Sequence, residues 1–159
     1  MRNVSPERLF LNYASPCLET RKGREQVLPE HEEKIRQLVA EGIERPPRKL
    51  LRYVFPNAYR GMRQAAQELG IEPWSAEAIR HYFLERHNEH VEVGRGKIPE
   101  KLLERCRIAI GRVVEDKGTT AIVNFGKKTE EVIKNGKEPI REGTRVATHY
   151  RQIVDVFEE

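Results

Sequence analysis

The pattern of apolar residues changes once along this chain of 159 residues, and the change limits what the chain can fold into. Up to about residue 90 apolar residues recur at helical spacing, whereas after about residue 105 they alternate as in β-strands. Two glycines and a proline lie between, in 93–99, and they discourage regular structure. We therefore expect an α+β protein with a helical domain over residues 1–92, a linker over 93–105 and a small β domain over 106–159.

Helix start and stop signals divide the first part into five short helices. Ser5 and Ser75 are suited to cap helix N-termini, and Gly70 is suited to end a helix. Five short helices in about 90 residues indicate a small orthogonal bundle, with Trp74 as an expected anchor of its core. The expected helices lie at about 6–13, 29–41, a short stretch between Pro47 and Pro56, 57–69 and 75–88.

The second part contains five short segments that are rich in strand-forming residues, separated by turn signals such as Asp116-Lys117-Gly118. Five short strands in about 50 residues leave exposed edges unless the sheet closes on itself. The sequence therefore predicts a small five-stranded β-barrel of the OB or SH3 kind. Its expected strands lie at about 108–113, 120–125, 129–133, 145–150 and 152–157.

Composition sets the compartment and the broad class. Charged residues make up 34% of the chain, and no apolar run approaches the ~20 residues of a membrane span, so we expect a soluble protein with no membrane insertion. The N-terminal residues lack the apolar core of a secretory signal, which favours a cytoplasmic location. Two cysteines, Cys17 and Cys106, are too few for a disulfide framework and are expected as thiols.

Charge argues against nucleic acid as a partner. The net charge is +4, and residues 1–96 carry 16 basic and 14 acidic side chains against 13 and 11 in residues 97–159. Nucleic-acid-binding proteins usually concentrate their basic residues in one segment. One local cluster, of Arg45, Arg48, Lys49 and Arg52, is a candidate docking patch for phosphates or for an acidic protein surface, unless it simply faces water.

Cys106 and His149 are the first candidates for chemistry. Cys106 opens the first expected strand, and His149 follows 43 residues later near the end of another. A thiolate is a soft metal ligand, and the neighbouring Arg105 and Arg107 favour the charged form; the alternative is a cysteine that fills a small apolar niche. His149 is either a metal ligand or proton carrier, or a surface histidine on the strand face opposite Val146.

Four elements of this region form a recognisable set. They are Cys106 with Gly111-Arg112-Val113-Val114-Glu115, then Val123-Asn124-Phe125-Gly126, then Gly143 to His149, and an acidic tail of Asp155, Glu158 and Glu159. Read together, they resemble the HypC/HupF family, the small chaperones of [NiFe]-hydrogenase maturation, and the resemblance covers about 54 of 159 residues. Ile110 stands where the family has proline, and Cys106 is internal, whereas the family's cysteine becomes the mature N-terminus.

The resemblance implies a maturation or accessory chaperone rather than an enzyme. Such a protein docks on the immature hydrogenase large subunit, or on that of a related metalloenzyme, and on a HypD-like scaffold. Cys106 and His149 would contact a transiently held iron fragment or the partner, with no tightly bound cofactor. Because Cys106 is internal here, chelation through an α-amine is unavailable, which leaves docking better supported than iron transfer.

Three other interpretations remain at this point. The expected barrel could be a nucleic-acid-binding module, or the chain could be a permanent non-catalytic subunit of a redox enzyme. His87 and His90, with Glu85 and Glu89 nearby, form a possible secondary metal site. No complete catalytic group is recognisable in the sequence.

Overall fold

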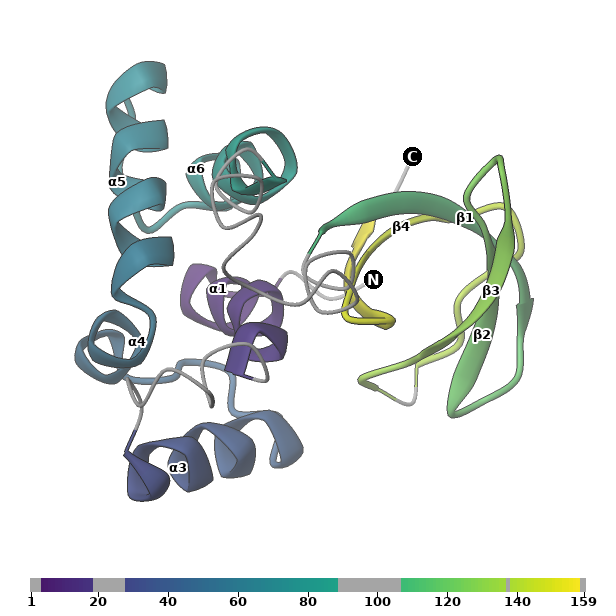
Figure 1. Ribbon diagram of the computed structural model, residues 1–159, viewed down its shortest axis with the longest axis horizontal. Coiled ribbons are helices and arrows are strands. Elements are labelled where there is room, and N and C mark those ends of the chain that lie inside the picture. Colours follow the sequence, from purple (N-terminus) through teal and green to yellow (C-terminus); the bar gives the residue numbers. More distant parts are fainter. Residues whose placement is uncertain (1–3, 19–27, 89–106, 137, 158–159) are drawn as a thin grey trace, which may run out of the picture.

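The computed structural model describes residues 4–18, 28–88, 107–136 and 138–157. Within these ranges five α-helices precede a five-stranded sheet, so the predicted α+β class is confirmed (Figure 1). The expected linker, Cys106 and His90 lie outside the described residues, and the division into two domains stays a prediction.

Local signals at the helix ends act as expected. The Ser5 Oγ accepts a hydrogen bond from the Arg8 amide at 3.0 Å, and the Ser75 Oγ accepts one from the Ala78 amide at 3.3 Å. Gly70 ends its helix with φ +67°, a left-handed conformation that favours glycine. The helices are α1 (Pro6–Ala14), followed by the short 3₁₀ turn η1 (Ser15–Cys17), then α3 (Pro29–Ala40), α4 (Arg48–Val54), α5 (Pro56–Leu69) and α6 (Ala76–His81).

The last helix changes its hydrogen-bonding pattern before it reaches the candidate site. α6 runs directly into a π-helical turn, η3 (Tyr82–Arg86), and His87 follows. A π-turn takes one residue more than an α-turn, and such turns are frequent at functional sites. No helix in the described ranges has both the length and the apolar character that crossing a membrane would require.

The strands pair in an order that differs from their order in the chain. The pairings run β1–β2–β3–β5–β4, and β4 pairs back with β1. All are antiparallel except the β3–β5 link, which consists of the single parallel pair Ile133 and Gln152. The strands are β1 (Ala109–Asp116), β2 (Thr120–Asn124), β3 (Thr129–Ile133), β4 (Arg145–His149) and β5 (Gln152–Phe157).

Apolar side chains form two clusters, and the larger one joins the helices to the sheet. The smaller cluster fills the inside of the curved sheet and includes Val113, Val123 and Val146. The larger cluster is built mainly by the helices but also contains Ala147 of β4 and Val154 of β5. Because Val146 and Ala147 are consecutive, β4 is buried on both faces, one inside the sheet and one against the helices.

Candidate functional site

His149 ends β4, and its side chain is fully buried. Its Nδ1 lies 2.7 Å from the main-chain oxygen of Tyr13 in α1, which lies between α5 and the sheet (Figure 1). A carbonyl oxygen only accepts, so the Nδ1 of His149 carries the hydrogen of this bond. The interpretation of His149 as a surface histidine is wrong, because helices cover the outer face of β4.

His87 lies beside His149, so the structure combines one residue from each predicted site. The two ring centroids are 5.0 Å apart, with an interplanar angle of 76°. The His87 side chain is buried, and its Nδ1 lies 3.4 Å from the Oδ1 of the adjacent Asn88. The partners that the sequence assigned to these histidines, Cys106 and His90, lie outside the described residues.

Asn88 fixes the start of the sheet next to this histidine pair. Its Nδ2 donates to the Ile108 carbonyl at 3.0 Å, and its Oδ1 accepts from the Ile108 amide at 2.9 Å. The side chain amide therefore pairs with both main-chain groups of Ile108, as a neighbouring strand would. Asn88, which follows His87 in the helix, therefore anchors Ile108, the residue before β1.

Of the two acidic partners expected for the secondary metal site, Glu85 is used elsewhere and Glu89 lies outside the described residues. Glu85 contacts the Nδ1 of His81, and the Nε2 of His81 lies 3.1 Å from Glu68. Glu68 also accepts a hydrogen bond from Arg86 at 2.9 Å, and these two donors lower the pKa of the Glu68 carboxyl. Among the described residues, no group of three or more His, Cys, Asp or Glu side chains is placed to hold a metal ion.

A buried carboxylate, Asp155 of β5, lies on the other side of Tyr13. The Tyr13 hydroxyl donates to Asp155 Oδ2 at 2.6 Å, and Arg80 of α6 donates to both carboxylate oxygens at 2.8 and 3.1 Å. Burial, followed by the negative charge of Asp155, raises the pKa of Tyr13 well above its usual range. The hydrogen bond to Asp155 raises the pKa of Arg80.

The sequence did not reveal this group, because Asp155 was assigned to an acidic tail and Tyr13 and Arg80 were not singled out. The assignment of Asp155 to a tail is wrong, because the residue lies within β5 and its side chain is only 4% exposed. A signal was present in the adjacent apolar pairs Val146-Ala147 and Ile153-Val154, since strands with apolar residues on both faces are buried on both faces. Such strands need another layer to cover them.

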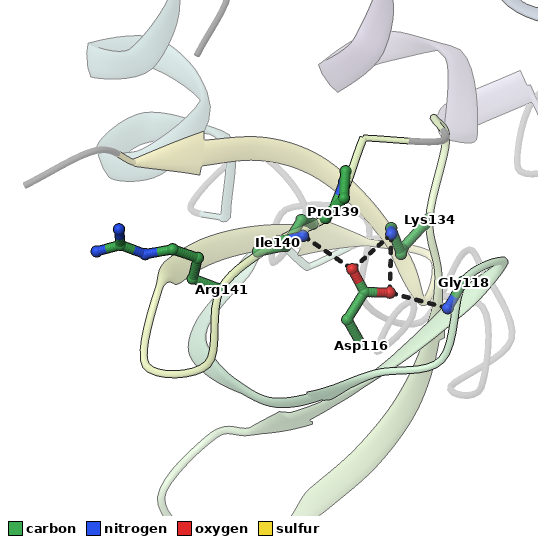
Figure 2. A pocket seen from close by; sticks show the side chains of 6 residues that line it. All are labelled: Asp116, Gly118, Lys134, Pro139, Ile140 and Arg141. Carbon is green, nitrogen blue, oxygen red and sulfur yellow. Dashed lines mark hydrogen bonds and ion pairs between the residues drawn. The ribbon is translucent and has the colours of Figure 1, made fainter.

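A second cluster, shown in Figure 2, surrounds Asp116 at the end of β1. The carboxylate accepts hydrogen bonds from Lys134 Nζ and from the amides of Ile140 and Gly118, each at 2.8 Å. The Lys134 side chain is only 3% exposed, and Arg141 points away from the carboxylate. An open hollow of about 430 Å³ adjoins this cluster. Because Asp116 and Lys134, the acid and the base that line it, are paired with each other, the cluster indicates a structural role.

A third feature is an open hollow of about 330 Å³ along β1. Gly111 is one of its lining residues, and a Cβ there would come within 2.6 Å of Val123 Cγ1, which belongs to the core inside the sheet, and 2.7 Å of the Asn124 carbonyl oxygen. Glycine is therefore required by packing at this position. The hollow is lined by Ile110, Gly111 and Arg112 of β1, by Asn124 and Gly126 from the end of β2, and by Arg145 of β4.

No family model matches this chain, and no curated protein is significantly similar to it.

We expect Tyr13→Phe to lower the free energy of unfolding by about 1–2 kcal/mol, because it removes a donor from a buried carboxylate. Urea denaturation with linear extrapolation measures the change. Tyr53→Phe is the matched control, since Tyr53 is 61% exposed and the substitution should change stability by less than about 0.5 kcal/mol. Equal effects of the two substitutions would show that the Tyr13–Asp155 bond contributes nothing.

Asp116 should give the sheet an acid-sensitive component of stability. The Lys134 hydrogen bond, followed by the Ile140 and Gly118 amides, lowers the pKa of Asp116 from 3.8 to about 2. The ionised carboxylate therefore stabilises the native state above about pH 4, and this contribution is lost as the pH falls through about 2. Asp116→Asn should lower the urea midpoint near neutral pH, with the difference from wild type closing towards about pH 2. A difference independent of pH would contradict this assignment.

Proposed function

We propose that this chain is a non-enzymatic accessory protein that docks on a metalloenzyme during its assembly. Following the resemblance, the partner is the immature large subunit of a [NiFe]-hydrogenase or a related enzyme, or a HypD-like scaffold of its maturation. The docking part is the five-stranded sheet, which we propose to be a small barrel of the OB kind. Its circuit of strand pairings supports that assignment.

The observation that carries the proposal is the meeting of three separate sequence elements in one place. Arg112 of β1 pairs with Asn124 of β2 on one side and with Arg145 of β4 on the other. These residues belong to three of the four elements on which the resemblance to the HypC/HupF family rests. Six residues of these elements line the hollow on the sheet, so the resemblance follows a local surface as well as a run of sequence.

The outer face of β1 has the composition of a docking surface. Ile110 and Val114 are 45% and 44% exposed, and the exposed Arg112 lies between them on the same face. Protein interfaces commonly combine a few exposed apolar side chains with arginine. A partner that covers β1 would remove both apolar side chains from water and engage the lining of the hollow.

His149 supports this surface indirectly. It is fully buried and bonded to the Tyr13 carbonyl, so in this arrangement it positions β4 against α1 and does not contact a partner. Because β4 pairs with β1 along Ala109–Arg112, a shift of β4 would move the proposed docking face. Contact with an iron fragment remains proposed for Cys106 alone, which lies outside the described residues.

Stacking of bases on the sheet receives little support. The guanidinium carbons of Arg145 and Arg80 lie 5.1 and 5.7 Å from the ring centre of Phe157 in β5. Phe125 is partly buried against the core of the sheet. Single-stranded nucleic acids bind such folds by stacking on exposed rings, and these two rings are already in use.

The proposal is tested by anaerobic affinity purification from the native host, with partners quantified by mass spectrometry. Ile110→Glu should reduce the recovery of hydrogenase subunits or maturation factors by about tenfold or more, because it places a charge in the proposed contact. Ile133→Glu is the matched control: Ile133 is 50% exposed on β3, outside the hollow, and its substitution should leave recovery unchanged. Circular dichroism checks that both variants fold.

Cys106→Ala extends the same experiment to the thiol. Weakened recovery would place Cys106 in the contact, whereas normal recovery with failed maturation would assign the thiol to iron handling. The absence of hydrogenase components from the wild-type sample would contradict the proposed function. Equal losses in the two isoleucine variants would contradict the proposed docking face.

A further inference from the structure

The positive charge of this chain is concentrated in one short segment. Residues 45–67 contain six basic side chains and no acidic one, which leaves 23 basic and 25 acidic residues in the remainder of the chain. The net positive charge of the protein therefore comes entirely from this segment. The even balance between residues 1–96 and 97–159 conceals it, because the stretches on both sides of the segment are net acidic. That balance therefore does not by itself argue against a nucleic-acid partner for this segment. The six residues are Arg45, Arg48, Lys49, Arg52, Arg60 and Arg63.

The fold places this segment on α4 and α5, at the end of the molecule remote from the sheet (Figure 1). All six basic side chains are exposed. We call this surface the α4–α5 basic face. It is separate from the proposed docking face on β1, so a partner can occupy either surface without covering the other.

Two aromatic rings hold three of the arginines in place. The guanidinium carbons of Arg52 and Arg63 lie 4.7 and 5.8 Å from the ring centre of Tyr59. That of Arg48 lies 5.2 Å from the ring of Trp74, and the two rings are 6.0 Å apart. Cation–π contacts restrict the side chains before binding, which lowers the entropy lost on complex formation.

The charge of this face is barely neutralised within the protein. The Nη2 of Arg48 lies 3.5 Å from the Oε2 of the buried Glu7. The Nη1 of Arg60 lies 3.5 Å from the amide oxygen of Asn57. In the part of the chain that the structure describes, Lys49, Arg52 and Arg63 make no ion pair with a carboxylate. Their charge is directed towards solvent and towards whatever binds there.

We infer that the α4–α5 basic face binds an acidic segment of a partner protein. Ordered guanidinium groups suit carboxylates, which they engage through paired hydrogen bonds. The rings of Tyr59 and Trp74 are covered by arginine side chains. The exposed ring of Tyr53 is paired with His31 at a ring-centre distance of 4.8 Å, so the face offers few free rings for stacking of single-stranded nucleic acid. This inference does not depend on the partner proposed for β1.

The test uses the full chain and fluorescence anisotropy with a labelled oligoglutamate peptide. The wild type should bind this peptide, with affinity falling as salt rises, and should not bind a neutral glycine–serine peptide of equal length. The double substitution Arg52→Glu and Arg63→Glu should weaken binding by roughly tenfold or more. Arg52→Lys with Arg63→Lys should lose part of the affinity, because lysine keeps the charge but not the planar group.

The matched control is Lys127→Glu with Arg141→Glu, two exposed residues of the sheet region whose substitution changes the net charge equally. This variant should bind oligoglutamate like the wild type. No binding by the wild type, or equal weakening in the two charge-reversed variants, would overturn the inference. Labelled single-stranded RNA and duplex DNA are measured in parallel. Tighter binding of either one, lost with Arg52 and Arg63, would assign the face to nucleic acid and also overturn the inference.

Discussion

The pairing of the buried Asp155 carboxylate with Tyr13 and Arg80 is the interaction on which the arrangement of helices and sheet depends. Leaving an ionised carboxylate unpaired in the interior costs several kcal/mol, so Tyr13 of α1 and Arg80 of α6 have to remain beside β5. Tyr13 also accepts the hydrogen bond from His149 through its carbonyl oxygen. Tyr13 of α1 therefore bonds to both β4 and β5. Arg80 attaches α6 to the same carboxylate of β5.

The two proposed binding surfaces depend on different parts of the structure. β1 pairs with β4, and β4 packs on α1, so the geometry of the outer face of β1 depends on the contact between helices and sheet. The α4–α5 basic face lies at the other end and depends on Tyr59 and Trp74. If both proposals hold, the chain can bring two parts of an assembly together.

The sequence predicts features that depend on neighbouring residues. Ser5, Ser75 and Gly70 act as expected because caps and left-handed helix ends are set within a few positions. The burial of His149 and Asp155 was missed because it depends on α1, which lies more than a hundred residues earlier in the chain. Single-residue alternation cannot show that both faces of a strand are covered.

The most direct test of this account follows unfolding with one probe in each part of the molecule. Trp74 is the only tryptophan and reports on the helices, while hydrogen exchange of the amides of 109–124 reports on the sheet. If the shared core and the Asp155 group join the two parts, both probes should change at the same urea concentration, as in a single cooperative transition. Separate transitions, with the sheet amides exchanging while Trp74 keeps its native fluorescence or the reverse, would contradict the account.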